Sequence, residues 1–346
     1  MNFQTIPPVP KVKELLDLAF GKARTKGHKK LKGDRIQILK TRETTKLDII
    51  KDDLRQRLDK VVKSFPAIDQ LPVFYQKLLR LTLDYVQLKK SLGAMAWAKA
   101  KISLLHKEHV RKIVQERSSA QINPTAKQFY GRVSSVLRQI QPNLASLEAA
   151  RRTMKQYPDI KEMVTVCIYG FPNVGKSTLL NNLTGSKAKV EAYAFTTTGI
   201  NAGYLQVHSK DEEHSKDEVY PKDKASSKHA AWPKIQLLDV PGTLAREDKM
   251  NNIERIAELA VQELAHEVIY VFDITEYCGF SIQQQLELFH RLEKNRNVLV
   301  YISKADLQDQ AAIDAWASEH HITHYSLAQL QQKIAGLVVS SLVLPS

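Results

Sequence analysis

Cysteines and long apolar runs are scarce in this chain. Its two cysteines, Cys167 and Cys278, are too few for a disulfide framework or a four-ligand zinc site, so we expect structural thiols in a reducing compartment. No apolar run approaches the ~18 residues of a membrane-spanning helix, and the N-terminus lacks the charged-then-apolar order of a signal peptide. These absences predict a cytoplasmic protein with no membrane partner.

Acidic residues are scarce in the first half only. Residues 1–160 hold 33 Lys and Arg against 14 Asp and Glu, a net charge of +19, whereas residues 161–346 hold 18 against 23, a net charge of −5. The overall excess of +14 therefore belongs to the first half. A charge of this sign favours an acidic partner such as nucleic acid.

The basic half has the apolar spacing of helices. Residues such as Leu47, Leu54 and Leu58 recur at the helical period, and runs of β-branched residues are few. We expect an interruption near Gly93, a new helix from Asn123-Pro124 and a break at Pro142. The simplest packing is an antiparallel helical bundle over residues 1–158.

A dense basic segment, residues 22–42, lies inside this half and contains two glycines. Such a charge run is typical of a solvated, mobile arm, and it fits a nucleic-acid contact equally well. The sequence leaves both interpretations open.

Residues 159–346 alternate short β-rich runs with helical segments. Several runs are continuously apolar, which indicates a largely parallel sheet covered by helices on both faces, a doubly wound α/β domain. A charged stretch, residues 208–231, reads as an insertion without assigned chemistry. The candidate strands are residues 163–169, 200–207, 234–240, 267–274, 297–303 and 322–327.

The first of these runs leads into Gly170-Phe-Pro-Asn-Val-Gly175-Lys176-Ser177, the pattern G-x-x-x-x-G-K-[ST], and then into a helical segment. In this pattern glycines let backbone N–H groups cradle phosphates, Lys176 neutralises the β/γ charge, and the Ser177 hydroxyl ligates Mg²⁺. A chance match in a turn is the alternative, but strand, loop and helix follow in the required order. The predicted phosphate site comprises Gly170, Asn173, Val174, Gly175, Lys176, Ser177 and Thr178.

Two later motifs complete a predicted magnesium site. Asp239 and Gly242 end the third run as Asp-Val-Pro-Gly, where the carboxylate can hold the magnesium's water shell and the glycine amide can reach a γ-phosphate. Alone, this string is a good turn sequence. Thr197 is expected to close onto Mg²⁺ and the γ-phosphate, with Thr196 and Thr198 as alternatives. The candidate catalytic residues are Lys176, Thr197 and Gly242, and the candidate magnesium ligands are Ser177, Thr197 and Asp239, the last through water.

A guanine-recognition motif follows the fifth run. Ser303-Lys304-Ala-Asp306 matches N/T-K-x-D except at its first position. The Asp306 carboxylate can accept hydrogen bonds from N1 and the exocyclic amine of guanine, which favours GTP over ATP. Ser326 and Leu327 form a degenerate match to a loop that touches the guanine oxygen through a backbone amide.

With these motifs in order, the chain resembles the Obg-like GTPases and, within them, the nucleolar GTP-binding protein family of the Nog type. The strings NFQTIPPVP, GFPNVGKST, AYAFTTTGI and DVPGTL carry the resemblance, and TEYCGFSIQQQLELF (275–289) is the most specific. The resemblance implies GTP, GDP and Mg²⁺ as ligands, a GTPase domain after a helical bundle, a function in assembly of the large ribosomal subunit, and contact of the bundle with ribosomal RNA. We expect a monomer similar to the short archaeal members.

Three positions bear on the activity and the ligands that this resemblance implies. Thr243 stands where a glutamine would position the attacking water, so slow intrinsic GTP hydrolysis is expected. Ser303 replaces the usual asparagine and loses an amide that ties the base loop to the P-loop. Asn173 matches an asparagine that helps to hold K⁺ in several related GTPases, and a structural role in the turn fits it as well.

The sequence therefore predicts a GTPase switch whose nucleotide state alters how the basic bundle engages ribosomal RNA. One alternative is a nucleotide-gated protein-interaction module without direct RNA binding, in which the basic face is solvated. Another is an Obg-like ATPase, which Asp306 disfavours and Ser303 makes less remote.

Overall fold

The computed structural model describes residues 3–26, 34–185, 191–192, 200–206, 234–243 and 252–343. The chain divides into two compact units, which are described separately. One unit holds the chain up to Pro72 together with Thr82–Gln156. The other holds Val73–Leu81 and the chain from Tyr157 onward.

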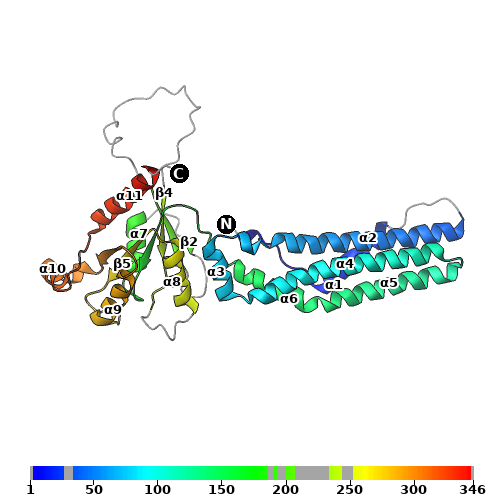
Figure 1. Cartoon of the computed structure of the whole chain (residues 1–346), viewed down its shortest axis with the longest axis horizontal. Helices are drawn as coiled ribbons and strands as arrows, with labels where there is room; N and C mark the ends of the chain where they lie inside the picture. Colours follow the sequence, from blue (N-terminus) through cyan, green and yellow to red (C-terminus); the bar gives the residue numbers. More distant parts are fainter. Residues whose placement is uncertain are drawn as a thin grey trace, which may run out of the picture. The chain divides into compact units, whose positions relative to one another are not determined.

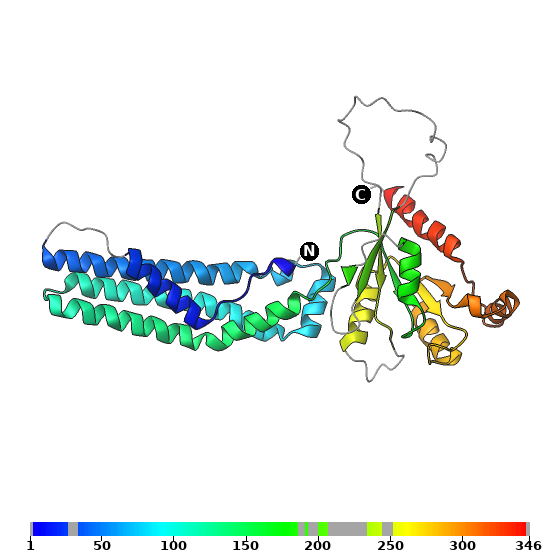
Figure 2. The ribbon, with the colours of Figure 1, turned by 180° about the vertical axis from the view of Figure 1, so that it is seen from behind.

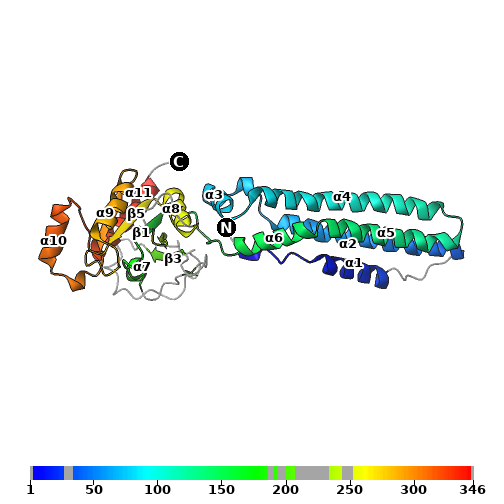
Figure 3. The ribbon, with the colours of Figure 1, turned by 90° about the horizontal axis from the view of Figure 1, so that it is seen from below.

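The first unit is helical. Its long helices α2 (Arg35–Ser64), α4 (Tyr85–Gln115) and α5 (Ser119–Gln139) run side by side (Figures 1 and 3). Helix α1 (Val12–Lys26) packs against α2, and α6 (Gln141–Met154) packs against α4. Two short 3-10 helices, η1 (Phe3–Thr5) and η2 (Ile68–Gln70), complete the unit. The predicted helical bundle is confirmed, and apolar side chains at the helical period fill its core.

Helix boundaries differ from the prediction at two places. Gly93 lies inside α4 without interrupting it, and the break falls before Tyr85, where the Asp84 carboxylate caps the helix by accepting from Gln87 N. Helix α5 begins before Pro124, because the Ser118 hydroxyl already accepts from Ala120 N. The break predicted at Pro142 is present, with the proline in the first turn of α6.

The basic segment 22–42 enters both flanking helices. Residues 22–26 end α1, whose buried side chains Leu15, Ala19 and Ala23 are spaced four apart. Residues 35–42 begin α2, which Asp34 caps by accepting from Ile36 N at 3.2 Å. Residues 27–33 lie outside the described part. The packing of α1 therefore orders the first part of the segment, and the N-cap of α2 orders the last part. A count of charges detects neither feature.

The second unit contains a six-stranded sheet in the order β2-β3-β4-β1-β5-β6. Strands β4 (Lys234–Asp239), β1 (Thr165–Tyr169), β5 (Glu267–Phe272) and β6 (Val298–Ile302) are parallel. Strands β2 (Glu191–Ala192) and β3 (Asn201–Gln206) are antiparallel additions at one edge. The predicted doubly wound α/β architecture is confirmed as a mostly parallel mixed sheet.

Helices flank this sheet on both sides, with α7 and α8 on opposite sides in Figure 2. Helix α7 (Lys176–Thr184) contacts β3 and β4 together with α11 (Leu327–Val343), whereas α8 (Asn252–Leu264) contacts β1. Helices α9 (Ile282–Glu293) and α10 (Gln310–Glu319) and the 3-10 helix η5 (Ala305–Leu307) also belong to this unit. Within the described ranges, none of the helices has the length and apolar character needed to span a membrane.

One detail of the sheet differs from the prediction. The candidate strand 322–327 contributes only one bridge, between His324 and Val300, because helix α11 begins at Leu327. The charged stretch 208–231 lies outside the described residues.

Cys167 and Cys278 are free and buried, as expected for structural thiols.

Helix α3 (Val73–Thr82) is grouped with the sheet-containing unit, although it precedes α4 in the chain. The Tyr75 hydroxyl donates to Pro158 O at 2.7 Å and accepts from Ile160 N at 2.9 Å. Lys77 Nζ lies 2.6 Å from Glu263 Oε1 on α8. The predicted domain boundary at residue 158 assigned α3 to the helical bundle. The contacts of α3 with the second unit join residues more than 80 positions apart, so no local sequence pattern indicated them.

A carboxylate joins the N-terminal segment of the helical unit to α6. Glu148 accepts two bonds from the Arg151 guanidinium, at 2.7 and 2.8 Å, and one from Val9 N at 3.1 Å. The Arg151 bonds lower the pKa of Glu148 to about 2, with further help from Val9 N and Arg152 against the opposing effect of burial.

We expect Glu148→Gln to destabilise the helical unit by about 1–3 kcal/mol at pH 7. A lowered carboxylate pKa stabilises the fold above the unfolded-state value, so the difference from wild type should shrink as pH falls from about 4.5 toward about 2. Urea unfolding followed by circular dichroism at several pH values measures this. Asp52→Asn, which changes an exposed carboxylate on α2, is the control; equal losses in the two variants would contradict the assignment.

Candidate functional site

The loop after β1 has a backbone that only certain residues adopt. Gly170, Asn173 and Gly175 have φ of +146°, +62° and +97°, all positive. A Cβ on Gly170 would lie 2.8 Å from Val271 O, so glycine is required there. Val174 is fully buried, and α7 begins at Lys176 with Thr178 in its first turn. Positive φ values ahead of a helix N-terminus turn N–H groups inward, which is the geometry of an anion-binding loop.

Lys176 folds back over this loop. Its Nζ donates to Phe171 O at 2.7 Å and to Gly170 O at 3.3 Å, and the residue is 7% exposed. Burial lowers the pKa of Lys176 to about 8, and the nearby Asp239 carboxylate only partly opposes this. The ammonium therefore stands in the loop with carbonyl partners that an anionic oxygen would outcompete.

Ser177 and Asp239 meet directly. The Ser177 hydroxyl donates to Asp239 Oδ2, and Asn201 Nδ2 donates to the same oxygen at 3.2 Å. Asp239 ends β4, which pairs with β1, so the parallel register brings its carboxylate beside the start of α7. A hydroxyl and a carboxylate suit Mg²⁺, which binds through few protein oxygens and keeps several waters. The sequence analysis did not select Asn201. The antiparallel pairing of β3 with β4 places Asn201 opposite Asp239.

Gly242 lies against the phosphate loop. A Cβ on Gly242 would lie 2.4 Å from Pro172 N and 2.7 Å from Pro172 Cα, so no side chain fits without movement of the backbone. The Asp-Val-Pro-Gly motif is therefore in backbone contact with the loop. A displacement of one of these two segments would therefore displace the other.

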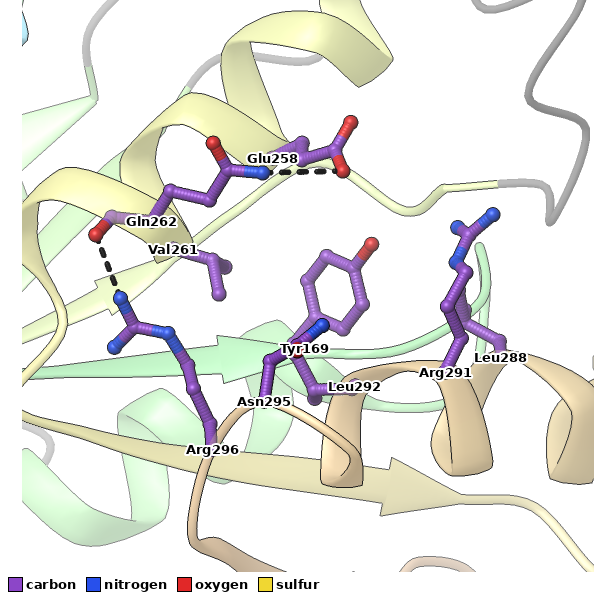
Figure 4. Close-up of a pocket in the computed structure, with 9 residues that line it drawn as sticks. All are labelled: Tyr169, Glu258, Val261, Gln262, Leu288, Arg291, Leu292, Asn295 and Arg296. Atoms are coloured by element: carbon purple, nitrogen blue, oxygen red, sulfur yellow. Dashed lines mark hydrogen bonds between the residues drawn. The ribbon is translucent and has the colours of Figure 1, made fainter.

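Thr243 follows Gly242 and is fully buried, with its hydroxyl donating to the Tyr169 hydroxyl at 2.7 Å. Tyr169 ends β1 and lines a cleft of about 460 Å³ between α8 and α9, where its ring stands near Val261 and Leu292 (Figure 4). The Thr243 hydroxyl is thus engaged inside the domain rather than presented to a phosphate.

The predicted base motif also meets the phosphate loop. Ser303 is 5% exposed, and its Cβ lies 3.4 Å from the position that a Cβ on Gly175 would take. Its hydroxyl donates to Phe272 O at 2.9 Å. The serine therefore packs against the loop, while its hydrogen bond joins it to β5.

Lys304 and Asp306 complete this motif. Lys304 has a positive φ of 53°, and its Nζ pairs with the buried Asp273 carboxylate at 2.5 Å. Asp306 lies in η5 with an exposed side chain. Asp273, which the sequence analysis missed, closes the apolar run of β5, and an acidic residue at the end of a buried strand was the signal that could have identified it.

The signature string 275–289 forms a loop braced by hydrogen bonds and then α9. Asp273 accepts from Thr275 N and Cys278 N, and the fully buried Gln285 bonds the backbone on both sides of the loop, at Asp273 and Phe280. The Phe280 ring packs on Phe171 of the phosphate loop with centroids 4.8 Å apart. The string therefore contacts the phosphate loop through Phe280 and is joined to the base motif through Asp273, which also binds Lys304.

Ser326 and Leu327 lie at the start of α11. Ser326 N donates to Gln329 Oε1 at 2.8 Å, and Gln329 N donates to Ser326 Oγ at 3.4 Å, a reciprocal cap. Tyr325 N donates to Val300 O, which ties this turn to β6, the strand that leads into Ser303. The three candidate threonines, Thr196, Thr197 and Thr198, lie outside the described residues.

A strand, a phosphate loop and a helix, followed by an aspartate at the end of the neighbouring parallel strand, define a P-loop nucleotide-binding domain. Residues 3–161 match the family described as NOG1 N-terminal helical domain, and residues 165–304 match 50S ribosome-binding GTPase. An uncharacterized protein of Methanocaldococcus jannaschii is 33% identical over 316 residues, covering 90% of this chain and 83% of that protein. The chain belongs to the Nog family of P-loop GTPases.

Nucleolar GTP-binding protein 1 of Drosophila melanogaster is 29% identical over 88% of this chain, and that of Saccharomyces cerevisiae is 27% identical over 89%. The matches cover 44% and 45% of those two proteins. Among solved structures, the G domain of the T. maritima FeoB iron transporter aligns over 51% of this chain and 98% of its own at 24% identity, with a TM-score of 0.33, too low to bear on the assignment.

We expect GTP affinity to be flat below about pH 8 and to fall above it by up to about tenfold per pH unit. Because the pKa of Lys176 is lowered to about 8, the lysine loses its charge near pH 8 when no nucleotide is bound. Above this pH, binding of the phosphates requires the lysine to take up a proton, and this uptake lowers the affinity. Titration of a fluorescent GTP analogue from pH 7 to pH 9.5 measures the effect. Lys176→Arg keeps the charge at all these values and should remove the pH dependence; an unchanged slope in this variant would contradict the assignment.

We expect Gly242→Ala to lower GTP affinity by about tenfold or more with a smaller effect on GDP, because the added Cβ displaces the motif from Pro172. The overpacking should also destabilise the domain by about 1–3 kcal/mol. Calorimetric titration with each nucleotide and thermal unfolding measure the two effects. Gly93→Ala, at a helical position with no atom within 4 Å of the added Cβ, should leave both affinities unchanged.

Proposed function

We propose that this protein is a GTP-hydrolysing switch in assembly of the large ribosomal subunit, in which nucleotide state alters the contact of the helical unit with ribosomal RNA. The observation that carries the proposal is the direct bond between Ser177 and Asp239, with Gly242 packed on the same loop. This arrangement gives the phosphate site a built-in means of responding to a γ-phosphate. The names of the relatives and of the matching families support the ribosomal context.

Each motif has a role in this proposal. Lys176 neutralises the β/γ charge, and Ser177 and Asp239 hold Mg²⁺, the latter through water. Thr197 closes onto the metal and the γ-phosphate in the GTP state. Asn173, which is exposed and has a φ of 62°, is assigned to the support of a K⁺ ion, and a purely structural role in the turn is the alternative.

Slow intrinsic hydrolysis follows from Thr243. Its hydroxyl is bonded to Tyr169, and a threonine in that position does not orient an attacking water as a glutamine does. The proposal therefore requires either another element of this chain or a partner on the assembling subunit to complete the catalytic site. We propose that the protein is a cytoplasmic monomer whose catalytic site is completed when it binds the assembling ribosomal subunit.

Guanine selection is assigned to Asp306, with the Ser326 and Leu327 turn contributing backbone amides. Asp306→Asn should lower GTP affinity by about a hundredfold, because the carboxylate charge is lost and the new amide NH₂, a donor, faces the exocyclic amine of guanine. The same change should raise affinity for XTP, whose 2-oxo group accepts from the new amide. Competition binding with GTP, ATP and XTP measures both.

Asp309→Asn is the matched control, since this exposed aspartate lies close by at the start of α10. A wild-type protein that prefers ATP, or an Asp306→Asn variant that keeps its guanine preference, would replace this proposal with the Obg-like ATPase.

A nucleotide-gated protein-interaction module is the second candidate. Trp97 and Leu104 on α4 are 45% and 58% exposed, and exposed apolar side chains of this size also occur at protein interfaces. Co-purification before and after RNase treatment separates the candidates, because only an RNA-dependent association is lost on treatment.

A further inference from the structure

Two neighbouring helices of the helical unit are almost free of acidic residues. Residues 85–107 and 117–147 contain neither Asp nor Glu, and they make up most of α4 and all of α5. Helix α2, by contrast, carries five carboxylates among its 30 residues. The helices α4 and α5, which pack against each other (Figure 3), together carry ten Lys and Arg against one carboxylate, Glu108.

The cations on these two helices are presented to solvent. Some basic residues of the unit are paired across helices, as Lys22 on α1 is with Asp53 on α2 and Lys99 on α4 is with Asp59 on α2. Within the described ranges, Lys89 pairs with Asp69 and Lys112 with Glu108, whereas seven other exposed cations of α4 and α5 form no ion pair with a carboxylate. They are Lys90, Lys101, Lys107, Arg111, Lys127, Arg132 and Arg138.

The outward faces of α4 and α5 adjoin each other. Glu108, on the outward side of α4, is bonded to Lys112 at 2.7 Å, and this bond lowers the pKa of the carboxyl. The charge of Arg132 on α5 acts in the same direction. The one carboxylate on the outer face of α4 is thus neutralised from its own helix and from its neighbour.

An aromatic side chain stands among these cations. Trp97 is 45% exposed, and Lys90, Lys101 and Leu104 follow the same face of α4 at spacings of four and seven residues. A half-exposed indole between lysines can stack on an unpaired base while the ammonium groups contact phosphates. The outer face of α5 adds the amides of Gln128 and Gln139, which suit sugar and phosphate oxygens.

We propose that the outward faces of α4 and α5 form the RNA-binding surface of this protein, with Trp97 as its base-stacking residue. This inference rests on the RNA contact in the proposed function and specifies where it occurs. RNA is favoured over a protein partner because cations outnumber apolar side chains on these faces and Glu108 is neutralised. The α1 and α2 side of the unit, which carries most of the carboxylates, is excluded as the main contact.

Charge-matched variants of the full chain test the location. The face variant is Lys90→Gln, Lys101→Gln, Arg132→Gln and Arg138→Gln, and the control variant is Arg35→Gln, Arg55→Gln, Lys60→Gln and Lys63→Gln, all exposed on α2. The probe is a fluorescently labelled RNA stem-loop with an unpaired loop, titrated at several salt concentrations. Circular dichroism checks that both variants are folded.

The face variant should lose about tenfold or more in affinity near 0.1 M salt, and its slope of log affinity against log salt should fall by about 3, since each lost phosphate contact removes about 0.7–0.9. The control variant should stay within about threefold of wild type. Trp97→Leu should lower affinity by about tenfold with an unchanged salt slope, because stacking releases no counterions.

Fluorescence gives a second readout, because Trp97 is the only tryptophan in residues 1–161 of a chain with three. In a Trp232→Phe, Trp316→Phe background, RNA should quench the Trp97 emission, and iodide should quench it less once RNA is bound.

The outcomes are distinguishable. Equal losses in the face and control variants would overturn the location but leave RNA binding in place. A face variant with wild-type RNA affinity that no longer binds a co-purified protein would overturn it in favour of protein docking. A wild-type protein that does not bind RNA would end both this inference and the RNA contact of the proposed function.

Discussion

The close approach of Gly242 to Pro172 is the constraint on which the nucleotide-binding unit depends. Because a Cβ at Gly242 would lie 2.4 Å from Pro172 N, the end of β4 and the loop after β1 share one small space. The parallel pairing of β1 and β4 positions both segments, and Gly170 similarly leaves no room against Val271 O. A ligand bound in the phosphate loop would therefore lie against the segments that follow both β1 and β4.

Polar groups extend this constraint across the sheet. Asp239 joins β4 to Ser177 on α7, and Asp273 joins β5 to Lys304 after β6. In both cases a buried carboxylate at a strand end holds a residue that the sequence motifs assign to nucleotide binding. Buried charges of this kind are stable only when paired, so the pairs also define the geometry of the site. In the helical unit, Asp53 on α2 pairs with Lys22 on α1 and with Arg57, whereas seven exposed cations of α4 and α5 have no carboxylate partner among the described residues.

Much of the architecture was predictable because the chain follows simple periodicities. The apolar run ending at Tyr169, the glycines of the phosphate loop and Asp239 at the end of the next parallel strand identify a P-loop domain without coordinates. Helix boundaries were less predictable: Gly93 lies within α4, and α5 begins before Pro124, because Asp84 and Ser118 form caps that override these residues. Strand β2 was missed because two residues carry no period.

The sequence by itself determined the two kinds of domain, the phosphate loop and the uneven distribution of charge, because these depend on local spacing and composition. Only the tertiary structure decided that α3 belongs with the sheet, that Asn201 and Asp273 join the site, and that Thr243 is engaged by Tyr169. It also decided which cations of the helical unit remain unpaired. Each of these depends on contacts between residues far apart in the chain, and such contacts are set by the packing of buried surfaces rather than by any local pattern.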